Sequence, residues 1–445
     1  MLLLALLFTN PRANAEAPAI TLSDAVEHAR QTPGVAAAQS AEQAAAAGYA
    51  QAWPGRLPSL SVSGNVLVYN KAQELTLFTS DTPIDCTGIP DPFGTLCASF
   101  GQPIIVREQV TTSLQAQLAV PITGQFAVDR QVAAAKDGMN AAQSSREASV
   151  ADAELEAKDA WFAAAQTEEQ LAIASSQVAS MTERVHVAET AFSAGSLTRN
   201  DLLLVRIALA QAKEAVAQLA GYRDLAYARL GVATGTGGDP VRPQGATEDP
   251  PKPVPDVAAL TERALKNRPE ILAMRDRVAA ARAAAAATSL ARIPSISGMA
   301  VYQHSTGQGA FGSPDTAYAG ASLNWNVWAF GRAAAGVTAA KAQADQLAHT
   351  LDGLEAGVRM DVLARVQALT VASSTWTLAA DTVTQATENL AIQERRQQTG
   401  TGTMQEVLDA NLALVRAQST RASALFDARR AEAGLTHAVG GDPWG

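Results

Sequence analysis

Side chains that could carry out catalysis are few and far apart in this sequence. Neither a His-Glu-x-x-His metalloprotease motif nor a Gly-x-Ser-x-Gly nucleophile motif occurs. His186 and Glu189 are three residues apart on an expected helix, where a solvated helix face explains them without a ligand. The other histidines are isolated from one another: His28, His304, His349 and His437. The sequence therefore predicts no enzyme, no cofactor and no metal site.

Two acids offer a different kind of chemistry, which is the attraction of cations. Glu406 and Asp409 follow a Gly/Thr-rich turn, and their three-residue spacing puts both carboxylates on one helix face. Carboxylates held close together favour cations and raise one another's pKa. Two structural explanations remain open at this point. Glu406 lies three residues after Thr403, which is the spacing of a capping box, and Asp409 is placed to complement a helix dipole.

The two cysteines are the remaining reactive side chains. Cys86 and Cys97 are separated by ten residues in a loop rich in Pro, Gly and Asp. Two cysteines with no further cysteine or nearby histidine make a poor zinc pattern. In an exported chain, such a pair predicts a disulfide that closes the loop.

The turn before Glu406 has a second copy earlier in the chain. Residues 195–203 align with residues 400–408 at a constant offset of 205, which places Thr198 on Thr403 and Asp201 on Glu406. The copies differ where Leu204 stands in the place of Asp409. A second alignment, at an offset of 236, places Pro33 on Pro269. These offsets indicate an internal duplication, with 31 extra residues between Gly64 and Leu118 in the first half.

The duplication divides the chain into two similar halves. Residues 16–234 form the first structural repeat, 235–255 a linker with six prolines that is expected to be irregular, and 256–445 the second repeat. Residues 1–15 end in an Ala-x-Ala pattern that predicts a signal peptide. The formal charge of −9 and the absence of a basic block argue against a nucleic-acid partner.

Each half contains two stretches of strand-like alternation. They cover residues 59–68, 113–120, 295–303 and 319–327, with apolar and small polar side chains in turn. About ten alternating residues match a tilted membrane strand with one wet face, although a soluble half-buried sheet has the same pattern. Aromatic residues near these stretches are candidates for an interfacial girdle: Tyr69, Tyr302, Tyr318, Trp325 and Trp328.

Long Ala-rich helices are expected after the strands. The segments 126–192 and 332–398 contain no proline, and each would be about 100 Å long as one helix. Heptad spacing predicts supercoiled packing, and alanine in the seam allows close approach. Each half is thus expected to hold one long helix beside two shorter helices stacked end to end, namely 20–53 with 201–233 in the first half. Beyond residues 1–15, no apolar segment is long enough for a membrane-spanning helix.

The repeated order of strands, long helices and turns, with the segment Glu406–Ala410, resembles the TolC family of outer-membrane efflux proteins. The resemblance covers nearly all of the chain after the signal segment. It implies a mainly α-helical barrel in the periplasm, and four strands per chain that contribute to a twelve-stranded transmembrane barrel. It also implies an exit duct in the outer membrane that works with a periplasmic adaptor protein and an inner-membrane transporter, in efflux or type I secretion.

Strand number supports a homotrimer independently, because four strands cannot close a membrane barrel and eight leave no pore. The resemblance further implies functional roles at both turns. It makes Glu406 and Asp409 candidates for the periplasmic gate, with Arg395 or Arg396 as basic partners, because Gly402 stands where some relatives carry arginine. It makes the turns candidates for adaptor docking, through Gly195, Ser196, Leu197, Gly400 and Thr401. A soluble periplasmic coiled-coil scaffold and a passive porin remain as alternatives.

Overall fold

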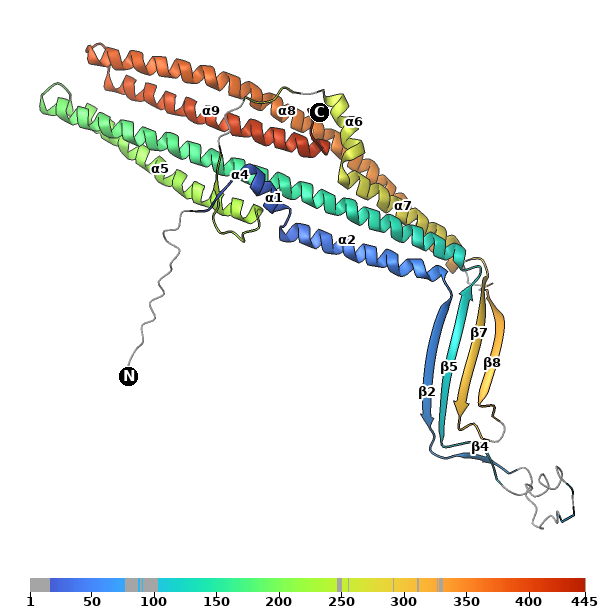
Figure 1. The fold of residues 1–445 in the computed structure, drawn as a ribbon. Coiled ribbons are helices and arrows are strands. Elements are labelled where there is room, and N and C mark those ends of the chain that lie inside the picture. Colours follow the sequence, from blue (N-terminus) through green and yellow to red (C-terminus); the bar gives the residue numbers. More distant parts are fainter. Residues whose placement is uncertain are drawn as a thin grey trace, which may run out of the picture. The chain divides into compact units, whose positions relative to one another are not determined.

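The computed structural model contains long helices and a four-stranded sheet (Figure 1). It describes residues 17–76, 87–88, 90, 103–245, 250–254, 256–290, 292–309, 312–325, 327 and 331–444. The predicted signal peptide, both cysteines and Trp328 lie outside these residues. The chain divides into two compact units, described in turn below. Unit 1 comprises residues 1–45, 138–278 and 346–445, and unit 2 comprises residues 46–137 and 279–345.

The two halves of the chain contain the same order of main elements. The first half has α1 (Leu22–Ala29), α2 (Pro33–Ala52), β2 (Ser59–Val68), β5 (Val110–Pro121), α4 (Gln125–Ser193) and α5 (Arg199–Ala233). The second half has α6 (Val257–Asn267), α7 (Pro269–Leu290), β7 (Ser295–Thr306), β8 (Asp315–Asn324), α8 (Arg332–Gln398) and α9 (Met404–Val439). The long helices begin and end within one residue of the predicted limits, because no proline interrupts them.

Local capping explains where the short helices begin. Thr21 accepts a hydrogen bond from the Asp24 N–H and caps α1, and Asp256 caps α6 through the N–H groups of Ala258 and Ala259. Pro33 and Pro269 each occupy the first position of a helix, where a missing N–H costs nothing. The Pro33 and Pro269 positions therefore separate α1 from α2 and α6 from α7.

In unit 1, the C-terminal ends of α5 and α9 contact the residues that join α1 to α2 and α6 to α7. A Cβ atom on Gly235 would lie 3.7 Å from Thr32 Cγ2, and one on Gly440 would lie 3.2 Å from the Arg268 backbone nitrogen. Both glycines have positive φ, 79° and 71°, which side-chain-bearing residues rarely adopt. The shorter helices are therefore stacked end to end in both halves, as the sequence predicts.

The core of unit 1 contains two apolar clusters, which involve corresponding helices of the two halves of the chain. One is formed by α1, α4 and the end of α5, around the buried Trp161 ring and Leu230. The other is formed by α6, the start of α7, α8 and the end of α9, around Ile271, Leu369 and Leu435. Trp161 also donates its indole N–H to the Ile20 carbonyl at 3.0 Å, so a buried polar group is satisfied.

The linker is less irregular than the sequence suggests. β6 (Arg242–Pro243) pairs in parallel with β1 (Ala19–Ile20), and Trp444 donates its indole N–H to the Pro253 carbonyl at 2.8 Å. Two-residue strands carry no periodicity, so the sequence pattern could not reveal them. The linker is thus attached to the surface of unit 1 by residues from both ends of the chain.

Unit 2 contains an antiparallel sheet in the order β2-β5-β7-β8. The register places Leu60 opposite Leu118, Leu118 opposite Ala300, and Ala300 opposite Ala319, all on one face. The neighbouring residues Ser59, Ser61 and Ser63, with Gln115 and Gln117, lie on the other face. One face of the sheet is therefore apolar and the other is largely polar. On the apolar face, Val66 and Val68 are 68% and 71% exposed.

The strand predictions need correction in three respects. The fourth strand ends at Asn324, so Trp325 and Val327 lie beyond it, and it begins earlier, at Asp315. The excess segment of the first half contains an additional small sheet of β3 (Gln73–Leu75) and β4 (Ile104–Arg107), which was not predicted. Tyr318 pairs with Val301 on the largely polar face, so it does not belong to a girdle on the apolar face.

Candidate functional site

The first predicted docking turn joins α4 to α5. Gly195 adopts a φ of 73°, and the Ser196 N–H donates to the Ala191 carbonyl at 2.9 Å. This pattern satisfies the last carbonyls of α4 in the manner of a Schellman motif. Thr198 then caps α5 in a capping box with Asp201. Gly195 and Ser196 are exposed, whereas Leu197 is half-buried.

The second turn, between α8 and α9, has the same geometry. Gly400 has a φ of 75°, and the Thr401 N–H donates to the Arg396 carbonyl at 2.9 Å. Gly400 and Thr401 are both exposed. The glycines at both turns are required by the backbone, since an L side chain at this φ is strained. The two glycines therefore mark the ends of α4 and α8, in addition to their proposed docking role.

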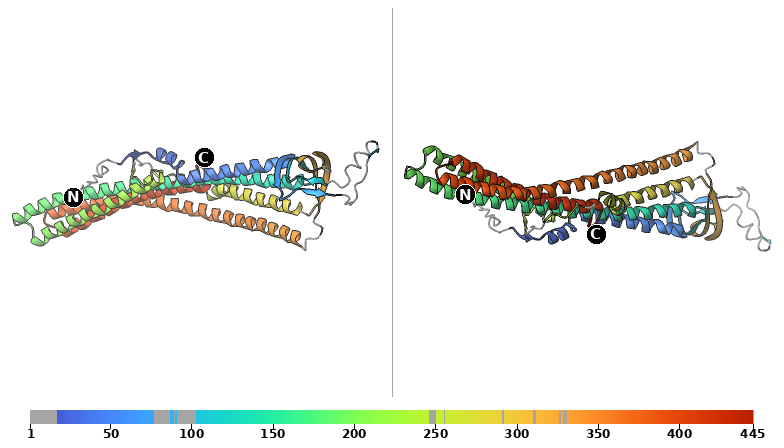
Figure 2. Two further views of the ribbon diagram at one scale, coloured as in Figure 1. Left: turned by 90° about the horizontal axis from the view of Figure 1, so that it is seen from below. Right: turned by 90° about the horizontal axis from the view of Figure 1, so that it is seen from above.

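The two turns are held together by an apolar cluster within unit 1. Leu197, Leu202 and Val205 of the first hairpin pack with Met404 and Leu408 of the second. Leu197 precedes the N-cap of α5 and packs on Leu202, as in a hydrophobic staple. Figures 1 and 2 show the two hairpin turns side by side. Leu197 thus has a packing role that its position in a docking turn did not predict.

Glu406 forms the capping box that the sequence left as one of its explanations. Its Oε2 accepts the Thr403 backbone N–H at 2.8 Å, and its N–H donates to Thr403 Oγ1 at 3.3 Å. Its Oε1 lies 3.6 Å from an Arg396 guanidinium nitrogen. The Thr403 backbone hydrogen bond lowers the pKa of the Glu406 carboxyl, and the Arg396 charge adds to this effect. In the single chain Glu406 is therefore an ionised cap with a basic neighbour.

Asp409 lies one helical turn further along α9 and has a separate environment. It is exposed, and its Oδ1 accepts a hydrogen bond from Gln405 Nε2 at 2.9 Å. Glu406 and Asp409 thus share a helix face but have different hydrogen-bond partners. Arg396, one of the two basic partners considered from the sequence, is the one that reaches Glu406.

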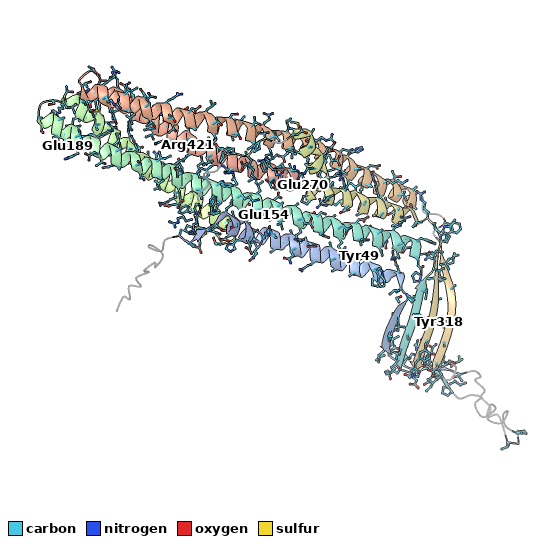
Figure 3. The ribbon with its side chains drawn as sticks, turned by 45° about the horizontal axis from the view of Figure 1, so that its top comes forward. Tyr49, Glu154, Glu189, Glu270, Tyr318 and Arg421 are labelled. Atoms are coloured by element: carbon cyan, nitrogen blue, oxygen red, sulfur yellow. The ribbon has the colours of Figure 1, made fainter. Side chains whose placement is uncertain are left out.

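Polar contacts between the two hairpins were not identified from the sequence. Arg184 of α4 pairs with Glu394 of α8, and Gln177 of α4 donates to the buried Asn411 of α9. Asn411 directly follows Ala410 of the heptad pattern. A polar residue beside this apolar seam was the sequence signal that could have revealed the contact with Gln177. Glu189, labelled in Figure 3, pairs with Arg206 of α5 at 2.7 Å and is not a ligand partner of His186.

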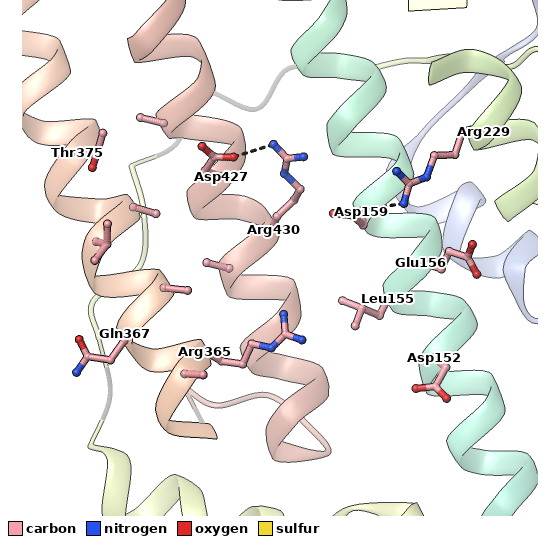
Figure 4. Close-up of a pocket in the computed structure, with 16 residues that line it drawn as sticks. Asp152, Leu155, Glu156, Asp159, Arg229, Arg365, Gln367, Thr375, Asp427 and Arg430 are labelled. Carbon is pink, nitrogen blue, oxygen red and sulfur yellow. Dashed lines mark hydrogen bonds and ion pairs between the residues drawn. The ribbon is translucent and has the colours of Figure 1, made fainter. Parts of the chain in front are cut away.

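A groove of about 840 Å³ lies among α4, α5, α8 and α9 in unit 1 (Figure 4). Arg229 reaches Asp159 at 3.3 Å, and Arg430 pairs with Asp427 at 2.7 Å. Arg365 pairs with Asp361 at 3.2 Å and packs where Gly434 has no Cβ. These charged groups neutralise one another and do not form a nucleophile–base arrangement. Among the described residues, no group of three metal-binding side chains is close enough to hold a metal ion.

No helix in the described part of the chain combines the length and the apolar composition needed to cross a bilayer.

The chain resembles known proteins both in sequence and in fold. Residues 260–441 match the family model for outer membrane efflux proteins. The fold resembles the outer membrane protein VceC of Vibrio cholerae, with a TM-score of 0.76 and 18% identity over 94% of this chain and 96% of that chain. It also resembles the CmeC outer membrane channel of Campylobacter jejuni, with a TM-score of 0.78 and 14% identity over 95% and 86% of the two chains.

A third structure extends the comparison to an open channel. The open state of the Neisseria gonorrhoeae MtrE outer membrane channel matches with a TM-score of 0.73 and 17% identity, over 95% of this chain and 89% of that chain. The search of curated proteins gave no match.

These structures show that the chain has the fold of solved outer-membrane channel proteins. Over residues 260–441, the chain is similar to the outer membrane efflux protein family. The resemblance to the TolC family, the mainly α-helical fold and the outer-membrane location predicted from the sequence are thus confirmed. The matching family model describes outer membrane efflux proteins, which favours an efflux protein over a soluble scaffold or a passive porin. The named structures are described as an outer membrane protein and as outer membrane channels, not as enzymes.

The cap at the second turn gives a testable prediction. Glu406→Ala removes the acceptor of the Thr403 N–H, so amide exchange at Thr403 becomes faster after correction for intrinsic rates. The folded-state pKa of Glu406 is depressed, so the stabilising effect is present above the unfolded-state pKa. It is lost as the pH falls through the folded-state pKa, and wild-type exchange then approaches that of the variant. Asp201→Ala is the control, because it affects Thr198 instead; equal exchange in wild type and Glu406→Ala at neutral pH contradicts the assignment.

Proposed function

We propose that the protein is the outer-membrane exit duct of a tripartite export system and works as a homotrimer, without chemistry of its own. The observation that supports this function is the open four-stranded sheet with one apolar and one polar face. Three such sheets give twelve strands, which is enough for a barrel with a water-filled interior. The apolar face would contact lipid, and the polar face would line the pore.

The edges of the sheet support association with further copies. β2 pairs only with β5 in this sheet, and β8 only with β7. Unpaired backbone N–H and C=O groups in hydrocarbon cost several kcal/mol each. Pairing of β2 with β8 of a neighbouring chain satisfies both edges and closes the barrel.

The helices of unit 1 present matching surfaces. α5 exposes Ile207, Tyr222 and Leu225 on one side, while its buried residues lie on the opposite side. α8 exposes Met360 and Leu378. Apolar stripes of this kind on a helix surface favour packing against another helix. In the proposed trimer, α5 of one protomer packs against α8 of the next.

A charge in these stripes tests the trimer. The combined change Leu225→Asp and Leu378→Asp places two carboxylates in the proposed interface and should convert the trimer into monomers. Light scattering in detergent, corrected for bound detergent, measures the number of chains. Thr182→Asp, at an exposed position of α4, is the control and should remain trimeric. A monodisperse wild-type monomer that keeps its β-sheet signal would refute the trimer.

We further propose that Glu406 and Asp409 line the periplasmic gate. In a trimer these positions place six carboxylates around one axis. The lowered pKa of Glu406 in the single chain keeps its carboxyl ionised, whereas repulsion around the ring acts in the opposite direction. Arg396 lies near enough to Glu406 to reduce the charge of the ring, which makes it the basic partner of the proposed gate. Such a ring favours cations.

Single-channel recording tests the gate. The combined variant Glu406→Ala and Asp409→Ala should show reduced cation preference and weaker block by divalent ions added on the periplasmic side. Asp201→Ala, at the equivalent position of the first turn, is the control and should leave selectivity unchanged. Unchanged selectivity and unchanged block in a folded double variant would contradict the gate. Glu406 would then be only a helix cap, and Asp409 only a surface residue.

The exposed residues of the two turns are the proposed adaptor-docking surface. Gly195 and Gly400 are unsuitable test positions, because any L side chain strains their backbone. Ser196 and Thr401 are exposed, and each follows the positive-φ glycine of its turn, so bulk is added there instead. The combined change Ser196→Trp and Thr401→Trp should abolish export and adaptor co-purification while trimers remain in the membrane. Gln43→Trp on α2 is the control; normal export by the double variant would exclude docking at these turns.

A further inference from the structure

The largely polar face of the sheet in unit 2 carries no charged side chain. The four strands are described in full, and their only acidic, basic or histidine side chains are His304 and Asp315. These two residues pair across β7 and β8 on the opposite face, where His304 Nδ1 lies 2.8 Å from Asp315 Oδ1. Acidic and basic residues make up 17% of the chain, so their absence from a whole face of the sheet requires an explanation.

Amides and hydroxyls take the place of charges on this face. Gln115 and Gln303 lie opposite each other on β5 and β7, and Gln117 belongs to the next row of the same face. The other polar residues of the face are serines, threonines, asparagines and Tyr318. An amide group presents both a donor and an acceptor, and so does a hydroxyl. These side chains can therefore contact cations and anions alike.

Several of these groups form hydrogen bonds with one another. Gln303 Nε2 donates to Ser305 Oγ at 3.0 Å, and the hydroxyl oxygens of Ser297 and Ser322 lie 2.8 Å apart across β7 and β8. A dipole whose partner lies within the same face exerts a much weaker field on a passing ion than a fixed charge does. The face is thus polar enough to be wetted, but it offers no strong binding site for an ion of either sign.

The polar face is also the more enclosed of the two faces along β7. Val301 and Ser305 are each only 4% exposed, whereas Tyr302, which lies between them on the opposite face, is 49% exposed. Side chains crowd together on the concave side of a curved sheet and spread apart on the convex side. The concave side becomes the interior when a sheet closes into a barrel. Exposure therefore agrees with polarity in assigning this face to the interior of the proposed barrel.

Folding does not require such a face to be neutral. Positions that face the lumen of a membrane barrel contact water, where charges are tolerated and tune selectivity. Pores that select ions by sign use rings of Asp and Glu for cations, or of Arg and Lys for anions. A wall that could carry charges and carries none lacks this means of selection.

We propose that the polar face is a pore wall that does not discriminate between cations and anions, and that the amides of Gln115, Gln117 and Gln303 give it this property. The inference rests on the proposed membrane barrel and adds the class of cargo that the barrel accepts, which is polar molecules of either sign or of none. Selection by charge is then left to other parts of the duct, such as the proposed gate.

Chemical modification measures the electrical potential at the wall. The change Gln303→Cys is made in a chain that also carries Cys86→Ser and Cys97→Ser, and the trimer is placed in lipid nanodiscs. It is treated with two methanethiosulfonates, one bearing a sulfonate and one a trimethylammonium group. Each rate is divided by the rate of the same reagent with a small free thiol. The two normalised rates should agree within about threefold, because no fixed charge of the wall attracts or repels either reagent.

The outcomes of this test separate the wall from the barrel. Ala300→Cys in the same background is the matched control, because its side chain lies on the apolar face, and it should react with neither reagent. Normalised rates at Gln303→Cys that differ by about tenfold or more would overturn the neutral wall. Failure of Gln303→Cys to react with either reagent would instead contradict the proposed function, since the polar face would then not line a pore.

Channel recording in a salt gradient tests the amides themselves. Gln303→Glu and Gln303→Lys each place three like charges around the pore of a trimer. They should shift the ratio of cation to anion permeability in opposite directions, each by about threefold or more from the unmodified protein. Asp315→Asn is the control, because it removes a charge from the opposite face of the same sheet and should leave the ratio unchanged. Equal ratios in the Gln303→Glu and Gln303→Lys channels would overturn the assignment.

Discussion

The pairing of backbone groups in a membrane is the constraint on which the rest of the structure depends. A sheet in hydrocarbon must close, because each unpaired N–H or C=O costs several kcal/mol. The four strands of this chain leave β2 and β8 at open edges, and they expose Val66 and Val68 on the apolar face. In the proposed membrane barrel, a single chain with this sheet is incomplete, and association with further copies would satisfy its edges and cover its exposed helix stripes.

The helical part meets a different physical requirement, which is to remain ordered over helices of 69 and 67 residues. Alanine-rich seams allow the helices to approach closely, and αL glycines with capping boxes end each hairpin sharply. Polar contacts such as Gln177 with Asn411 connect one hairpin to the other. The two hairpins are thus joined both by the apolar cluster at their turns and by polar contacts along their length.

The second turn illustrates how one residue combines a structural role with a proposed functional one. Glu406 caps α9 and carries the charge assigned to the proposed gate. Its hydrogen bond to Thr403 keeps it ionised, so the capping role supports the electrostatic role instead of excluding it. The same holds for Leu197, whose packing on Leu202 positions the exposed turn beside it. A residue at such a turn cannot be assigned to docking or gating from its position alone.

The sequence by itself determined the strands of the sheet, the long helices and the two equivalent turns. These features have long periods or strong local signals: uninterrupted heptads, alternation over about ten residues, and glycine followed by a capping box. Only the tertiary structure decided which face holds Tyr318, how the linker pairs with β1, and that Arg396 rather than Arg395 reaches Glu406. The physical reason is the distance along the chain over which each kind of interaction acts. Periodicity and capping act within a few residues, whereas strand register, two-residue pairings and side-chain contacts between hairpins depend on segments that are far apart in the chain.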